Sequence, residues 1–274
     1  MNTDWLQSDV QVGGSTIHYA RTGGEGKPVI VLAHGFSDSG MCWLPVAQAL
    51  SDDYDVILPD AVGHGHSSRV QPGQELDLPG DLAGFIQALK LSRPVVGGHS
   101  MGASTTATMA ARFPQLARAL ILEDPVWRDE PVEDLMKPPA PGEPNPWLEF
   151  LKSAREQPTE AVMAYGRAQN PLWPEVEMRP WAESKQQFDP NFIAARQESW
   201  LVDWRSVAKA ITVPTLLITA EPEKGSIVTA KIAEEAEDLN PQIQVVQIHN
   251  SGHNIRRENP PAYFAAIRAF LAEL

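Results

Sequence analysis

The sequence contains a single cysteine and no long apolar run. Cys42 alone excludes an internal disulfide and a zinc site built from cysteines. No stretch of about 18 apolar residues occurs anywhere in the chain, so nothing in it predicts a membrane-spanning helix. The first residues also lack the basic segment and the apolar segment that together mark a secretory signal. We therefore expect a cytoplasmic protein.

Basic residues are scarce as well. The 22 lysines and arginines are outnumbered by 35 aspartates and glutamates, which gives a formal net charge of −13. Nucleic acids and anionic membranes both attract basic patches, so we expect neither as a partner. The 274 residues are enough for one large α/β domain with an insertion.

Short apolar runs alternate with amphipathic stretches along most of the chain. Runs of this kind are typical of strands buried on both faces of a parallel sheet. They occupy residues 28–33, 54–59, 94–98, 119–122, 214–220 and 243–248. Residues 9–22 instead alternate around Gly13 and Gly14, which predicts a β-hairpin. The pattern predicts a mostly parallel, doubly wound sheet of about eight strands.

The middle of the chain has a different composition. Twelve of the 24 prolines lie between Pro125 and Pro190, and six of the eight tryptophans lie between Trp127 and Trp204. Proline at this density excludes long strands and favours short helices. We expect a helical cap over residues 126–205, inserted after the sixth strand of a core formed by residues 1–125 and 206–274. Two or three of the tryptophans should line a pocket, and Trp127 is the first choice.

A serine stands between one apolar run and the helical stretch that follows it. The segment reads Gly98-His99-Ser100-Met101-Gly102. Such a strand–serine–helix turn is so sharp that side chains two residues either side of the serine would collide, and glycine removes those collisions. The turn predicts a nucleophile elbow with Ser100 at its tip.

With three further motifs, this elbow makes the chain resemble the α/β-hydrolase superfamily, in its serine hydrolase and esterase-like branch. The other motifs are His34-Gly35-Phe36, the run from Pro59 to Ser67 with glycines at 63 and 65, and Gly252-His253. Their order agrees with the Ser…acid…His order of that superfamily. A serine at the elbow argues against the dehalogenase and epoxide-hydrolase branches, which carry aspartate there.

The resemblance implies a role for each motif. His253 is expected to be the general base, because a serine hydroxyl needs a base within hydrogen-bond reach. The backbone N–H groups of Phe36 and Met101 are expected to form the oxyanion hole. His34 should shape that loop and, with Trp127, contribute to the substrate pocket.

Three carboxylates could orient His253. The superfamily usually places the acid after the strand at 215–220, where this chain has Glu221 and Glu223. Glu221 is preferred because it lies nearest the strand end, whereas an ungapped alignment favours Glu223. A third position follows the preceding strand, as in some dehalogenases, and is occupied by Asp124.

The sequence thus predicts a serine hydrolase that cleaves small, largely apolar esters or lactones through an acyl-enzyme. A carbon–carbon bond hydrolase with the same triad is one alternative, and a sensor of a hydrophobic ligand with weak turnover is another. No metal or organic cofactor is expected. The expected partner is a small hydrophobic molecule, and the protein is expected to be a monomer or a homodimer.

Overall fold

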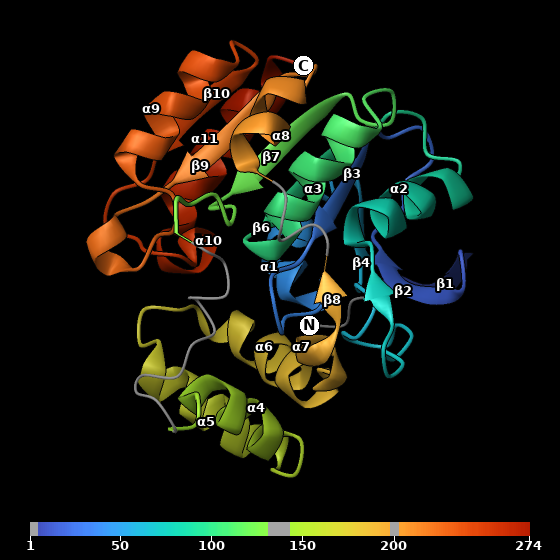
Figure 1. Ribbon diagram of the computed structural model, residues 1–274, viewed down its shortest axis with the longest axis vertical. Coiled ribbons are helices and arrows are strands. Elements are labelled where there is room, and N and C mark those ends of the chain that lie inside the picture. The colour runs from blue at the N-terminus through green and yellow to red at the C-terminus, as the bar shows by residue number, and fades with distance from the viewer. Residues whose placement is uncertain (1–4, 131–142, 198–202) are drawn as a thin grey trace.

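A mostly parallel sheet of eight strands organises the computed structural model, which describes residues 5–130, 143–197 and 203–274 (Figure 1). Its strands are β1 (Leu6–Val12), β2 (Ser15–Arg21), β3 (Val29–Ala33), β4 (Asp55–Pro59), β6 (Val95–His99), β7 (Ala119–Glu123), β9 (Thr215–Thr219) and β10 (Ile243–Gln247). They lie in the order β1-β2-β4-β3-β6-β7-β9-β10. The hairpin β1–β2 and the pair β2–β4 are antiparallel, and the other neighbours are parallel. The predicted sheet of about eight strands is confirmed.

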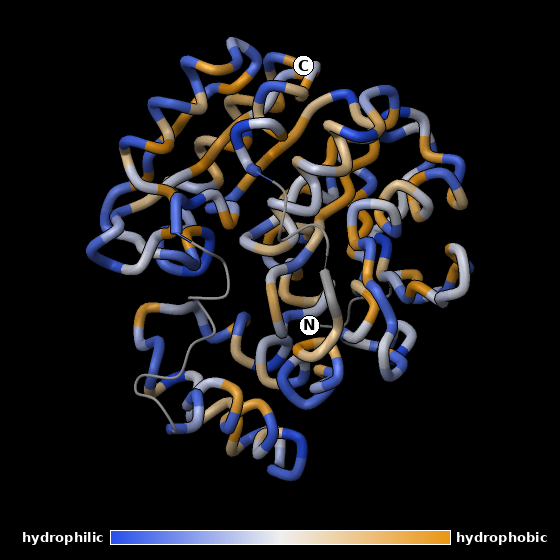
Figure 2. Tube along the Cα trace, viewed as in Figure 1, coloured by the Kyte–Doolittle hydropathy of each residue, from blue (hydrophilic) through white to orange (hydrophobic). Residues whose placement is uncertain are grey.

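Helices cover both faces of this sheet. They are α1 (Leu44–Leu50), α2 (Leu78–Ala88), α3 (Met101–Arg112), α8 (Trp204–Ala210), α9 (Ala230–Leu239), α10 (Ile255–Glu258) and α11 (Pro260–Ala272). One apolar core joins the sheet to α2, α3, α8 and α9, and a second joins it to α1 and α11. Figure 2 shows hydrophobic residues along the central strands and hydrophilic ones on the outer turns. Burial on both faces explains why the strands are continuous apolar runs.

Within the described residues, four short helices lie between β7 and α8. They are α4 (Pro146–Ala154), α5 (Thr159–Gln169), α6 (Glu175–Gln187) and α7 (Asn191–Ala194), and they gather at one end of the molecule in Figure 1. A small core of their own, which includes Met163, Met178 and Trp181, packs α4, α5 and α6 together. We call these four helices the cap. The limits 126–205 stay a prediction.

Helix α6 connects the cap to the core. It packs on the short 3-10 helix η1 (Gly40–Trp43), where the Cys42 thiol lies 3.7 Å from the carbonyl oxygen of Pro180. A second, two-stranded sheet pairs β5 (Glu75–Leu76) with β8 (Arg196–Gln197) and ties the end of the cap to the loop before α2. Within the described residues, every helix is too short or too polar to cross a membrane.

Candidate active site

Ser100 occupies the turn between β6 and α3. Its backbone has a positive φ of 54°, with ψ −117°, which is strained for a residue other than glycine. A Cβ atom added at Gly98 would lie 2.4 Å from the backbone of Gly102, and one added at Gly102 would lie 2.3 Å from the carbonyl oxygen of Ala33. The glycines are therefore required because strand, helix and neighbouring strand approach one another so closely. The strained turn places the Ser100 side chain at the wall of a cavity.

A buried aspartate holds the histidine that faces this cavity. His253 follows β10, and its Nδ1 lies 2.6 Å from Oδ2 of Asp124, which follows β7. Asp124 is fully buried, and its carboxylate also accepts hydrogen bonds from Ser226 Oγ and from the N–H groups of Ile227 and Val228, at 2.8 to 3.0 Å. A carboxylate with four donors keeps its position and requires the proton of the imidazole to stay on Nδ1. Nε2 is then left to accept a proton.

The preferred acid, Glu221, does not contact His253, so that geometric expectation is wrong. Glu221 forms an ion pair with Lys224 at 2.6 Å and accepts a hydrogen bond from the N–H of Asn250. Lys224 is the main reason that the pKa of Glu221 is lowered. Glu223 lies in the short 3-10 helix η4 (Pro222–Lys224), on the surface. Asp124, the alternative on the preceding strand, takes the position beside the histidine.

His99 supports the loop that carries His253. Its Nε2 lies 2.9 Å from the carbonyl oxygen of His253, and the two rings are 4.6 Å apart. Burial, together with the nearby Arg256 and His253, lowers the pKa of His99 well below its usual range, so the ring is neutral. A neutral ring donates to the carbonyl without placing a second positive charge beside His253.

The two expected oxyanion donors lie on either side of the elbow. Phe36 follows β3 and Met101 begins α3, and both residues line the cavity that Ser100 lines. Neither backbone N–H has a hydrogen-bond partner among the residues that the structure describes. Two free N–H groups at the start of a helix and in an adjacent loop suit an oxygen that develops negative charge. No hydrogen bond joins Ser100 to His253 within the described residues, although such bonds are often loose before substrate binds.

The cavity has a volume of about 590 Å³, which suits a small organic molecule. Its walls are aromatic rings from the cap and core, with amide groups between them. The rings belong to Phe36, Trp147, Tyr165, Trp173 and Trp181, and the amides to Gln169, Asn170 and Asn254. Lys185 and Arg257 also reach the wall, but both are paired with carboxylates.

Two residues expected in the pocket lie elsewhere. Trp127 is buried in the sheet core and stacks on Trp204 of α8, with ring centroids 5.4 Å apart. His34 is also buried, and it lines a separate cavity of only about 40 Å³. The aromatic lining comes instead from Trp147, Trp173 and Trp181. Their density in the sequence indicated a cap, but not which of them face inward.

Comparison with known proteins agrees with this geometry. The profile of the alpha/beta hydrolase fold family matches residues 28–260. The chain is 28% identical over 277 residues to an N-formylmaleamate deformylase of Pseudomonas putida, covering 99% of this chain and 98% of that protein. It is 27% identical over 282 residues to a 2-(acetamidomethylene)succinate hydrolase of Mesorhizobium japonicum, covering 97% and 95%.

The fold is also similar to that of a solved structure. The N-formylmaleamic acid deformylase of Pseudomonas putida superposes with a TM-score of 0.78 at 22% identity, covering 96% of this chain and all of that one. The sheet, the elbow and the matched family profile lead to one conclusion. This chain is a hydrolase and belongs to the α/β hydrolase fold family.

Proposed function

We propose that the protein hydrolyses small, largely apolar esters or lactones through an acyl-enzyme formed on Ser100. The observation that carries this proposal is the 2.6 Å contact between His253 Nδ1 and the fully buried Asp124, on the cavity that Ser100 also lines. A buried, four-fold hydrogen-bonded carboxylate both orients a histidine and stabilises its protonated form.

The proposed reaction has two stages. Ser100 Oγ attacks the substrate carbonyl carbon while His253 Nε2 accepts the hydroxyl proton, and the carbonyl oxygen becomes an oxyanion facing the Phe36 and Met101 N–H groups. The carbon–oxygen bond to the leaving group then breaks as His253 returns the proton to the leaving alcohol. A water molecule, deprotonated by the same nitrogen, attacks the acyl-enzyme and releases the acid and free Ser100.

The chemistry of the cavity wall supports a largely apolar substrate. Five aromatic rings provide contact area, and the amides of Gln169, Asn170 and Asn254 provide hydrogen bonds. The two cations at the wall, Lys185 and Arg257, are already neutralised by Asp38 and Glu177. They therefore offer little unpaired charge to a substrate carboxylate.

Amide hydrolysis is a second candidate, because two relatives that align along nearly the whole chain are a deformylase of N-formylmaleamate and a hydrolase of 2-(acetamidomethylene)succinate. The same triad can release an amine in place of an alcohol, with His253 donating the proton to nitrogen. Comparing kcat/KM for 4-nitrophenyl esters with that for matched 4-nitroanilides would separate the two candidates.

The direct test replaces Ser100 with alanine. Ser100→Ala should retain its fold and lose about four orders of magnitude or more in kcat towards 4-nitrophenyl acetate. A fluorophosphonate probe should label the wild-type protein at Ser100 and leave the variant unlabelled. Ser153→Ala, which removes an exposed hydroxyl of α4, is the matched control and should behave as the wild type. A tenth of the wild-type rate in Ser100→Ala would contradict the proposal.

A further inference from the structure

The loop that carries Phe36 is held by hydrogen bonds within its own backbone and from the His34 side chain. We call residues 35–38 the oxyanion loop. The carbonyl oxygen of Gly35 accepts hydrogen bonds from His34 Nδ1, at 2.8 Å, and from the N–H of Asp38, at 3.1 Å. The proton of His34 is on Nδ1 because Nε2 accepts from the N–H of Ala61. In a planar trans peptide the N–H points away from the C=O, so these bonds also fix the direction of the Phe36 N–H.

The next two peptides are each held by a buried side chain from elsewhere in the chain. Ser37 has a left-handed backbone, with φ 60°, which a residue other than glycine adopts at a conformational cost. Its N–H donates to His64 Nε2 at 3.2 Å, and its carbonyl oxygen accepts from Lys185 Nζ at 2.9 Å. The Ser37 hydroxyl has no partner in the described part of the chain, so the backbone is held by His64 and Lys185.

His64 is fixed as a neutral acceptor. Its Nδ1 lies 3.1 Å from the carbonyl oxygen of Val62, which places the proton there and leaves Nε2 to accept. Burial, and to a smaller extent His34, lower the pKa of His64 well below its usual range. The ring packs edge-on against Phe188 and Phe192, so it has little freedom to move.

Lys185 of α6 is a cap side chain that hydrogen-bonds to the loop. Its ammonium donates to Ser37 O, to Asp38 Oδ1 at 2.6 Å and to Ser184 Oγ at 3.2 Å, so all three hydrogens are used. The side chain is only 1% exposed. A buried ion pair of this kind is weak evidence for stability, because the cost of removing both charges from water can exceed their attraction. Its geometry suggests a different role.

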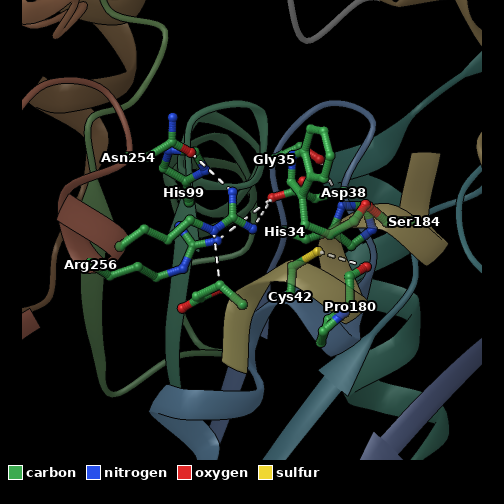
Figure 3. A network of polar contacts seen from close by, with 12 residues as sticks. His34, Gly35, Asp38, Cys42, His99, Pro180, Ser184, Asn254 and Arg256 are labelled. Atoms are coloured by element: carbon green, nitrogen blue, oxygen red, sulfur yellow. Dashed lines mark hydrogen bonds and ion pairs between the residues drawn. The ribbon is translucent and has the colours of Figure 1, made fainter. Parts of the chain in front are cut away.

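Asp38 extends the network to the segment that carries His253. Its second oxygen accepts from Arg257 Nη2 at 2.9 Å, and Arg257 also contacts Asn254 Oδ1 and Glu177 of α6. Burial opposes ionisation of Asp38, but Arg257, Lys185 and Arg256 outweigh it and hold the pKa well below its usual range. Figure 3 shows Asp38 facing the side chains of the segment that includes Asn254 and Arg256. One carboxylate thus joins the oxyanion loop, the cap and the base-bearing segment.

We propose that Lys185 is a positioning residue which, through the Ser37 carbonyl and Asp38, sets the direction of the Phe36 N–H. The oxyanion hole is therefore complete only when α6 of the cap is seated on the loop. The inference rests on the proposed serine hydrolase function, in which that N–H receives the oxyanion. It goes beyond that function because it makes a cap residue, remote from the triad in sequence, a determinant of transition-state stabilisation.

The test uses Lys185→Met in the full-length protein. Methionine retains the length of the side chain, and Asp38 keeps Arg257 and Arg256 as partners. We expect kcat for 4-nitrophenyl acetate to fall about 10- to 100-fold, with KM within about threefold, because a displaced donor weakens only the transition state. The affinity for a trifluoromethyl ketone, which forms a tetrahedral oxyanion on the serine, should fall by the same factor. Lys152→Met, at an exposed lysine of α4, is the matched control and should change neither quantity.

A second variant tests the same loop from its other side. His64→Phe removes the acceptor of the Ser37 N–H within an aromatic cluster that can hold the new ring. It should show the same paired loss of kcat and of inhibitor affinity, and it decides the question if Lys185→Met does not fold.

Wild-type kcat in either folded variant would overturn the inference, as would a loss of kcat with unchanged affinity for the ketone. Those results would leave the proposed triad intact. Activity that survives Ser100→Ala would instead remove the proposed function itself.

Discussion

Asp124→Asn distinguishes the proposed triad, in which Asp124 is the acid, from the one that the sequence favours, in which Glu221 is the acid. The two oxygens of Asp124 accept from four donors: Ser226 Oγ, the N–H groups of Ile227 and Val228, and His253 Nδ1. Asparagine offers one oxygen and an NH₂ group, so at least one backbone N–H is left facing another donor. A buried donor without a partner costs about 1–3 kcal/mol, and the free energy of unfolding should fall by that amount.

Both orientations of the amide impair the proposed chemistry. If its nitrogen faces His253, the ring must carry its proton on Nε2, which can then no longer accept the proton of Ser100. If its nitrogen faces Val228, the hydrogen bond to His253 survives, but no anion opposes the imidazolium that forms during attack. The kcat should fall by about 10³- to 10⁴-fold in either case.

The assay is steady-state hydrolysis of 4-nitrophenyl acetate, with urea denaturation to measure stability. Glu221→Gln is the control, since Glu221 pairs with the surface lysine Lys224 and should lose almost nothing in kcat. A folded Asp124→Asn that keeps more than a tenth of the wild-type kcat would refute the reasoning. So would an inactive Glu221→Gln.

Three further changes have outcomes that the structure specifies. Burial and Asp77 raise the pKa of Asp81 to about 6. The protonated carboxyl therefore stabilises the fold by about 3 kcal/mol at most below about pH 4, and this contribution is lost as the pH rises through 6. In urea denaturation Asp81→Asn should therefore be more stable than the wild type near pH 8, and an equal difference at about pH 4 would count against this. Trp127→Ala should lower the free energy of unfolding by about 3–5 kcal/mol and leave the chain-length preference for esters unchanged. An altered preference at wild-type stability would indicate instead that Trp127 contacts the substrate. Gly102→Ala would place a Cβ 2.3 Å from the Ala33 carbonyl oxygen. This clash should push α3 away from β3 and lower kcat about 100-fold. A wild-type kcat would show that the elbow can relax without loss of geometry.

The sheet and the elbow could be predicted because their causes are local. Strands buried on two faces must be apolar throughout, as Ala119–Glu123 and Thr215–Thr219 nearly are. The elbow could be predicted from the sequence for a similar reason, because only glycine fits at Gly98 and Gly102. The spacing of Gly98, Ser100 and Gly102 follows from a steric requirement that acts within five positions of the chain.

The acid could not be chosen from the sequence because two strand ends are equivalent candidates. β7 and β9 are parallel neighbours, so Asp124 and Glu221 leave the sheet at the same edge. What separates them is three donors at Ser226, Ile227 and Val228 that turn towards Asp124, and a lysine that engages Glu221. These contacts depend on the path of a loop, which periodicity does not reveal.

The cap was the other part that local pattern could not resolve. Proline and tryptophan density indicated short helices, but the stacking of Trp127 on Trp204 joins two segments on opposite sides of the cap in the chain. The contact between Lys185 and the Ser37 carbonyl is equally long-range. An amphipathic pattern assigns a residue to a face of a helix, but does not identify its partner.

The positive φ of Ser37, Ser100 and Asp124 has a consequence for laboratory evolution of this protein. In the part of the chain that the structure describes, three of the six non-glycine residues with positive φ lie at the proposed site. Each such residue destabilises the folded chain by about 1–3 kcal/mol, and glycine would relieve that strain. A selection for heat resistance alone would therefore favour glycine at position 100. It would enrich variants that are more stable but lack the proposed nucleophile and no longer turn over substrate. Stabilising this protein requires a screen that scores survival and hydrolysis in the same clone.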